Sequence, residues 1–221
     1  MRRRRIPEVM DGRDVKECDH AHALRSLNRV NRMLGVDRRL GRSVARFGVA
    51  DPSVLDLGCG GGGFLAYLST RAGPSISIGL DRSSFALQCA RAWHPDGIRW
   101  ISADARFLPF ADRAFDVVTC SLFLHHFEPA EVATILREAA RVARHGIVVG
   151  DLVRSRMAMV VTWLATRAMS RSWIVHVDAV RSVHAAFQVN ELAALARKAG
   201  LVDAVVQRRF PFRLVLTWKK S

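Results

Sequence analysis

The chain has 221 residues, half of them apolar, and a formal net charge of +14. These values exclude an intrinsically disordered chain and predict one folded domain with small additions. No stretch reaches the roughly 18 uncharged apolar residues that span a bilayer. The arginines at positions 2–5 are followed by proline and acids, not by the apolar segment of a secretory signal. We therefore expect a cytoplasmic protein.

Arginine dominates the basic residues, since lysine accounts for only four of the 34. A strongly basic balance favours nucleic acid or an anionic membrane surface as a partner. The arginines are spread along the whole chain, however, without a basic stripe interleaved with stacking aromatics. A solvated surface explains this charge, and nucleic acid is not the expected partner. The cysteines form no CxxC pair, so we expect reduced thiols and no metal site; they are Cys18, Cys59, Cys89 and Cys120.

The first fifty residues are polar and helical in character. Leu24, Leu27, Val30 and Leu34 are three or four residues apart, which predicts a helix over 22–35. A second short helix is expected over 38–48. Residues 1–50 are therefore predicted to form an N-terminal helical cap, and Asp51-Pro52 marks its boundary with a domain over 51–221.

From residue 53 onward, strand-like and helix-like segments alternate. Strands are expected at 53–58, 75–81, 98–104, 115–123 and 146–152, with helices at 64–72, 83–93 and 129–144. This alternation with short connections predicts an α/β fold, in which helices cover both faces of a parallel sheet.

The chain ends differently. A helical insert is expected over about 153–187, with a helix up to residue 172 and a loop behind it, followed by a helix over 190–200. Two strand-like runs, 201–209 and 212–219, are separated only by Phe210 and Pro211. They predict an antiparallel hairpin at the sheet edge, which brings the expected sheet to seven strands.

The stretch "LDLGCGGGGF" (55–64) joins the first strand to the next helix. Gly58, Gly60 and Gly63 satisfy GxGxxG, the dinucleotide fingerprint, which suggests an oxidoreductase. Asp56 argues against it, because a buried carboxylate needs a partner and would repel an anionic pyrophosphate. An acid at this position favours a ligand that carries a cation.

"LDLGCGGG" resembles the first motif, [DE]xGxGxG, of the class I S-adenosylmethionine (SAM)-dependent methyltransferases. The resemblance implies a Rossmann-like sandwich, SAM as cofactor, and its methionine moiety against Asp56, Gly58, Cys59 and Gly60. Gly61 and Gly62 exceed what the motif needs.

Later residues carry the resemblance further. Asp81 closes the second strand, where an acid of the family hydrogen-bonds both ribose hydroxyls, and Arg82 follows it. Asp104 and Ala105 in "SADARFLPF" match the segment that receives the adenine amino group and lies along the ring. Cys120, at the end of the fourth strand, completes the implied cofactor-binding set. Because carboxyl ends of neighbouring parallel strands meet at one edge, the acids 56, 81 and 104 are expected to share one crevice.

In this family the loop after the fourth strand faces the sulfonium and the acceptor. Here it reads "CSLFLHHFEP" (120–129) and lacks the NPPY-type tetrapeptide of enzymes that methylate exocyclic amines. His125 or His126 could take the proton of an attacking hydroxyl. Alternatively, one histidine packs against the cofactor and the other faces solvent. Methyl transfer does not demand a base, because the sulfonium is already activated.

The insert "RSRMAMVVTWLATRAMSRSW" (154–173) has three interpretations. It could be a lid lined by Met157, Met159 and Trp163, a basic amphipathic helix that makes transient contact with an anionic membrane, or a plain core helix. His176, Asp178 and His184, in the expected loop, could line the acceptor site.

Within the class, "LPF" and "HHF" resemble small-molecule methyltransferases of the ubiquinone/menaquinone-biosynthesis type. "PEVMD" and "RSVHAAF" resemble those that accompany bacterial type III polyketide synthases. These resemblances imply methylation, on oxygen, of a small aromatic or lipophilic acceptor such as a phenol, quinol or pyrone. An RNA methyltransferase and a non-catalytic SAM-binding protein are the alternatives. The sequence leaves open the acceptor, the methylated atom and whether the protein is an oligomer.

Overall fold

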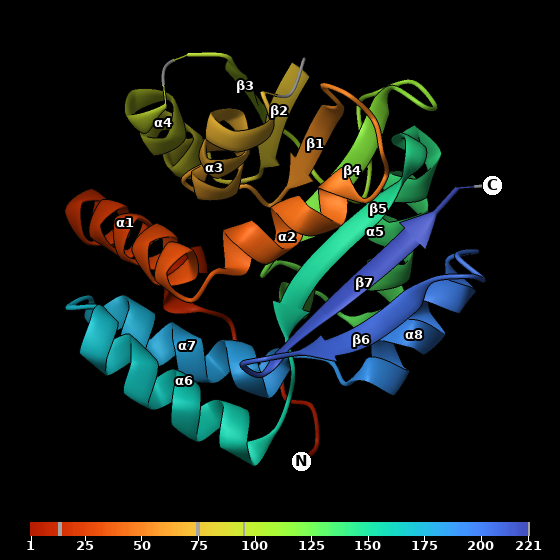
Figure 1. The fold of residues 1–221 in the computed structure, drawn as a ribbon. Coiled ribbons are helices and arrows are strands. Elements are labelled where there is room, and N and C mark those ends of the chain that lie inside the picture. Colours follow the sequence, from red (N-terminus) through yellow and green to blue (C-terminus); the bar gives the residue numbers. More distant parts are fainter. Residues whose placement is uncertain (13–14, 74–75, 95, 221) are drawn as a thin grey trace.

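The computed structural model describes residues 1–12, 15–73, 76–94 and 96–220. One seven-stranded sheet has the order β3-β2-β1-β4-β5-β7-β6, and the first five strands run parallel (Figure 1). The strands are β1 (Ser53–Leu57), β2 (Ile76–Asp81), β3 (Ile98–Ser102), β4 (Phe115–Ser121), β5 (Ala143–Leu152), β6 (Val205–Arg209) and β7 (Arg213–Lys219). The predicted fold class is confirmed. Ser75, at the start of the expected second strand, lies outside the described residues.

Successive residues of a strand point to opposite faces, and both faces of this sheet are covered. Val54 and Val117 pack under helices α2 (Val36–Ala45), α3 (Gly63–Ala72) and α4 (Ser84–Trp93). Their neighbours Leu55 and Val118 pack under α5 (Pro129–Val142) and α8 (Val189–Lys198). This two-sided burial explains why β1 and β4 are almost continuously apolar.

Local signals set the helix boundaries. The Ser83 hydroxyl accepts a hydrogen bond from the Ala86 N–H and so caps the start of α4. Pro129 begins α5, where Glu128 and Glu131 form a capping box. Helix α1 (Glu17–Met33) ends just before Gly35, which adopts the left-handed conformation between α1 and α2.

The two C-terminal strands form the predicted antiparallel hairpin, with β7 paired to β5 and β6 at the sheet edge. The insert differs from the sequence prediction. It contains two helices, α6 (Arg156–Met169) and α7 (Trp173–Ala185). The loop expected to hold residues 176, 178 and 184 is in fact α7, which Ser172 caps by accepting the Val175 N–H.

Helices α1, α6 and α7 gather beyond the carboxyl ends of the parallel strands (Figure 1). The N-terminal residues cross this region and include a short 3-10 helix, η1 (Val9–Asp11), that packs on α7. The carboxyl edge of the sheet is therefore enclosed by α1 and the N-terminal residues together with α6 and α7.

No helix in the described part of the chain is long and apolar enough to cross a membrane.

Candidate active site

A cavity of about 950 Å³ lies at the carboxyl edge of the parallel strands. Asp56, Asp81 and Asp104 all line it, each at or just after the end of a neighbouring strand. The predicted convergence of the three acids on one crevice is present in the structure. Other predicted site residues also line the cavity: Gly58, Cys59, Gly60, Arg82, Ala105, His125 and His126.

The glycines after β1 allow two close approaches. Gly58 has φ +67°, and a Cβ built on it would lie 2.1 Å from Cδ2 of Phe123. Gly62 has φ +76°, and its Cβ would lie 2.3 Å from the Trp100 ring. Only glycine tolerates this combination of positive φ and contact. The glycine at 62, which the motif does not need, is thus required by packing against β3.

Asp81 joins the glycine loop to the next helix. The Gly60 N–H donates to its Oδ2 at 2.8 Å and the Ser83 N–H donates to Oδ1 at 2.9 Å. Burial nevertheless raises the pKa of Asp81. Each carboxylate oxygen keeps further lone-pair capacity, so the group can still accept hydrogen bonds from a diol in the cavity.

Asp56 is only 3% exposed, and its Oδ1 accepts a hydrogen bond of 2.7 Å from the Thr119 hydroxyl of β4. Burial raises the pKa of Asp56 to about 7, and the nearby carboxylates of Asp37 and Asp81 add to the rise. A ligand cation in the cavity would stabilise the ionised form and lower this pKa.

Asp56→Asn is expected to flatten the pH dependence of stability. The folded pKa of about 7 lies above the unfolded value, so the native state binds more protons between roughly pH 4 and 7. The free energy of unfolding therefore falls as pH rises through this window, by up to a few kcal/mol for this group. Denaturant titrations at pH 5 and 7.5 should show a smaller loss in the variant than in wild type. Equal losses would contradict the burial argument.

Asp104 has a partner that the sequence did not reveal. The Arg106 guanidinium donates hydrogen bonds to both carboxylate oxygens of Asp104, with 2.6 Å between Nη2 and Oδ2. Its Nη1 also donates to Oε1 of Glu131 at 2.6 Å. This pairing lowers the pKa of Asp104 and keeps it ionised. Ala105, beside it, is buried. Cys120 is a residue of β4 whose side chain is buried in the core, and it is not among the described residues that line the cavity.

The N-terminal helices contribute acceptors to the same cavity. Asn31 of α1 has a buried Oδ1 without a hydrogen-bond partner in the described residues. Asp37 of α2 is buried, which raises its pKa to about 6. Together with Asp56 they offer oxygen acceptors to a group rich in N–H donors. The α-ammonium of SAM has this character, so the residues present fit that cofactor.

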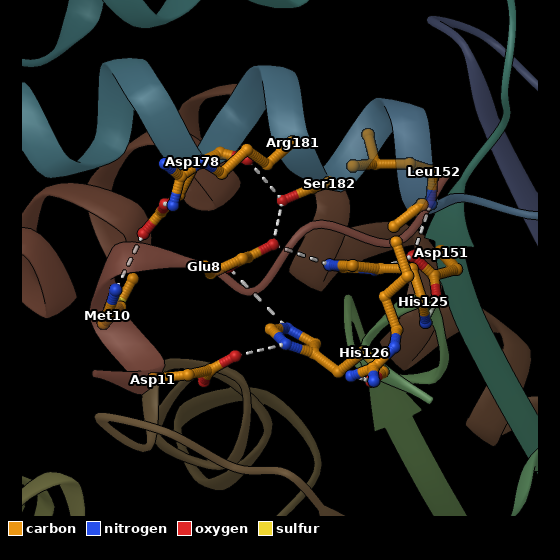
Figure 2. Close-up of polar contacts among 12 residues, drawn as sticks. Glu8, Met10, Asp11, His125, His126, Asp151, Leu152, Asp178, Arg181 and Ser182 are labelled. Carbon is orange, nitrogen blue, oxygen red and sulfur yellow. Dashed lines mark hydrogen bonds and ion pairs between the residues drawn. The ribbon is translucent and has the colours of Figure 1, made fainter. Parts of the chain in front are cut away.

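His125 also lines the cavity, in the 3-10 turn η2 (Leu124–His126). Its Nδ1 faces Asp151 Oδ1 of β5 at 2.7 Å, and its Nε2 faces Glu8 Oε1 at 3.3 Å (Figure 2). The Leu152 N–H donates to Asp151 at 2.7 Å and fixes that carboxylate. Burial opposes protonation, but the two carboxylates outweigh it and raise the pKa of His125 to about 10.

His126 stacks on His125 with ring centroids 4.4 Å apart, and its Nδ1 lies 3.0 Å from Asp11 Oδ2. Its Nε2 lies 3.8 Å from Glu8. One ligand atom each from Glu8, His125 and His126 lie within 4.8 Å of one another. This spacing does not by itself define a metal site, because each of the three side chains already has polar partners in the protein.

Glu8 lies between α7 and the two histidine rings (Figure 2). Glu8 also accepts a hydrogen bond from the Ser182 hydroxyl of α7. Next to it, the Val9 and Met10 N–H groups donate hydrogen bonds to the Asp178 carboxylate at 2.7 and 3.0 Å. Asp178 thus holds the N-terminal segment.

Of the other residues expected near the acceptor, neither His176 nor His184 is among the described residues that line the cavity. Sequence reasoning missed Glu8, Asp151 and the role of Asp178; the only local signal was the "PEVMD" stretch.

Apolar side chains also line the cavity. They include Leu122, Phe123, Leu152, Val161 and Phe212. Arg213 lines it as well, and its buried Nε has no hydrogen-bond partner in the described chain. The cavity therefore offers carboxylates, histidines and an apolar surface to its ligands.

Comparisons with known proteins agree with this geometry. Residues 54–146 match the family described as "Methyltransferase domain". The demethylmenaquinone methyltransferase of Roseiflexus castenholzii is 30% identical over 190 residues, covering 77% of this chain and 77% of that protein. The fatty-acid O-methyltransferase of Mycolicibacterium smegmatis is 35% identical over 105 residues, covering 47% and 38%. Among solved structures, the plantazolicin methyltransferase BpumL in complex with SAH has a TM-score of 0.72 at 17% identity, covering 96% and 93%.

The chain belongs to the SAM-dependent methyltransferase family, which confirms the class and the cofactor predicted from the sequence. Its match to the first curated relatives is partial, since it covers 18–42% of their own length.

Proposed function

We propose that the protein transfers a methyl group from SAM to a hydroxyl of a small lipophilic acceptor bound against the apolar side chains of the cavity. Three relatives support an acceptor of this kind by their names: a fatty-acid O-methyltransferase, a phthiotriol/phenolphthiotriol dimycocerosates methyltransferase and a demethylmenaquinone methyltransferase. In this proposal residues 1–50 form a cap over a methyltransferase domain of residues 51–221, with a helical insert over about 153–187.

The acids at the strand ends would hold the cofactor, which supplies a methyl group activated by a sulfonium. Asp81 would accept the ribose hydroxyls, and Asp104 with Ala105 would contact the adenine. Asp56, Asp37 and Asn31 would surround the ammonium end, with Gly58 and Gly60 leaving room for it. In this proposal Cys120 acts through the packing of β4, because it is buried in the core.

His125 would then act as the general base. Asp151 holds Nδ1, so Nε2 is the nitrogen that would take the proton of the acceptor hydroxyl. The cofactor would supply the methyl group to the hydroxyl oxygen, with its carbon–sulfur bond broken and SAH as the leaving group. In the free protein Nε2 faces Glu8. The acceptor hydroxyl would replace that contact, and the loss of the Glu8 carboxylate would lower the pKa of His125 toward the range where it can accept a proton. His126 stacks on the base and orients it.

The observation that carries this proposal is the His125–Asp151 pair in the same cavity as the three acids. Incubation with methyl-labelled SAM and a panel of alkylphenols, quinols and pyrones tests it, with RNA as a parallel substrate. Label in an ether product supports the proposal. Label in RNA, or SAM binding without transfer to any compound, would favour the RNA enzyme or the non-catalytic binder.

Glu8→Gln is expected to shift the pH profile of kcat/KM. The variant loses one of the two carboxylates that raise the pKa of His125, while Asp151 remains. A base with a lower pKa is deprotonated at lower pH, so the ascending limb of the profile should move to lower pH by about one unit. An unchanged limb would show that His125 is not the group that titrates.

A further inference from the structure

Six exposed apolar side chains gather on the helix pair α6–α7. They are Met157, Val160, Trp163 and Leu164 of α6, and Trp173 and Val177 of α7, each 36–60% exposed. Their spacing of three and four residues places those of α6 on one face. Single exposed apolar residues are ordinary, but a cluster of two tryptophans with four aliphatic side chains marks a contact surface. We call these six residues the α6–α7 patch.

The opposite face of the same helices lines the cavity. Val161, Thr162 and Ala165 of α6, with Val175 and Ala179 of α7, form part of its wall. The two helices pack against each other and run side by side at the carboxyl edge of the sheet (Figure 1). The patch is therefore separated from the cavity by the thickness of one helical layer.

The chain segment that carries the patch has charges of one sign only. Residues 152–177 contain no aspartate or glutamate. Arg156, Arg167 and Arg171 are exposed beside the patch, and the Arg167 guanidinium lies 4.2 Å above the Trp163 ring. An apolar face with tryptophan, flanked by arginines, fits the boundary between acyl chains and anionic headgroups.

A second copy of this chain fits the patch less well. A twofold dimer through α6–α7 would bring the same three arginines of both copies together without an acid from this segment to pair them. The net charge of +14 would oppose that approach further. An anionic lipid surface, in contrast, carries charge opposite to that of the three arginines and to the net charge of the chain.

We propose that the α6–α7 patch docks the protein on an anionic lipid bilayer, with the six apolar side chains in the interface and the three arginines at lipid phosphates. Docking itself does not depend on the methyl acceptor. The further consequence, delivery of a membrane-dissolved acceptor to the cavity, rests on the proposed function.

Vesicle co-sedimentation tests the docking. The full chain is mixed with vesicles of phosphatidylcholine alone or of phosphatidylcholine with phosphatidylglycerol, at physiological ionic strength. We expect the chain to bind the anionic vesicles, and to bind the neutral ones at least about tenfold more weakly. The double variant Trp163→Ser with Leu164→Ser should bind anionic vesicles about tenfold more weakly, and so should the triple variant with Arg156, Arg167 and Arg171 changed to Gln.

A matched control replaces two apolar residues that are exposed elsewhere, Ile76→Ser with Val202→Ser, and should bind vesicles as wild type does. Equal weakening in this control, or no binding of wild type to anionic vesicles, overturns the proposal. Sedimentation velocity without lipid adds a second check: a dimer that dissociates in the Trp163→Ser/Leu164→Ser variant would assign the patch to self-association instead. Because these readouts need no methyl transfer, failure of docking and failure of the proposed activity remain distinguishable.

Discussion

Replacing His125 with Asn is expected to lower kcat by roughly 10²–10⁴-fold while leaving the affinity for SAH unchanged. The reason is geometric: His125 pairs with Asp151 and Glu8, whereas the side chains proposed to hold the cofactor are Asp56, Asp81 and Asp104. Asp151→Asn should also lower kcat, because the neutral amide no longer stabilises the imidazolium that forms. Initial rates with labelled SAM and calorimetric titration with SAH measure the two effects separately.

His125 is buried between two carboxylates, so its removal also leaves Asp151 and Glu8 without their cation. The double variant His125→Asn with Glu8→Gln removes one of these charges and should fold with near wild-type circular dichroism. His22→Ala, an exposed histidine of α1 outside the cavity, is the control and should retain full activity. Activity of the double variant close to wild type would rule out His125 as the base.

Gly58→Ala is expected to lower both the free energy of unfolding and the affinity for SAH. The new methyl carbon would lie 2.1 Å from the Phe123 ring at a positive φ. Overpacking and backbone strain together cost about 3 kcal/mol, and relief by displacement of the loop would weaken SAH binding about tenfold or more. Denaturant titration and calorimetry check the two parts.

Gly48→Ala separates strain from overpacking. Gly48 has a similar φ of +70°, but no atom lies within 4 Å of the added carbon. The control should cost only about 1–2 kcal/mol and leave SAH binding unchanged. If both variants lost the same stability and both bound SAH normally, the contact between Gly58 and Phe123 would have no part in the site.

The strands and the acids at their ends could be predicted because both depend on local patterns. A short apolar run followed by an acid, as in "SVLDLG" or "SIGLD", encodes a buried strand and the place where it leaves the sheet. Parallel topology then brings these ends together. The order β3-β2-β1-β4-β5-β7-β6 does not follow from the alternation of strands and helices, because sheets with the same alternation can have different strand orders.

The acceptor side could not be predicted in the same way, because its contacts join distant segments. Glu8 and His125, which are in contact, are 117 positions apart in the sequence, and Asp178 and Val9, which share a hydrogen bond, are 169 positions apart. No local periodicity encodes such pairs. The sequence pattern does not predict helix α7, because its outward face carries Val177 beside polar residues, while Ile174 and Val175 are buried against the N-terminal segment.

Arg106 shows the same limit at a shorter range. The pattern around residues 104–110 predicts an acid after the third strand, where Asp104 lies, but not that the Arg106 guanidinium contacts both of its oxygens and reaches Glu131. The placement of an acid at a strand end follows from the backbone. Its partner depends on side-chain geometry that the sequence alone does not specify.

Calorimetric titration of the wild-type chain and of Asp81→Ala with SAH is the most direct measurement. If the acids at the strand ends form a nucleoside site, wild type binds SAH, Asp81→Ala binds it about a hundredfold more weakly because two charge-assisted hydrogen bonds are lost, and the exposed-acid control Asp203→Ala behaves as wild type. Failure of the folded wild-type chain to bind SAH at millimolar concentration, or unchanged binding by a folded Asp81→Ala, would contradict the account.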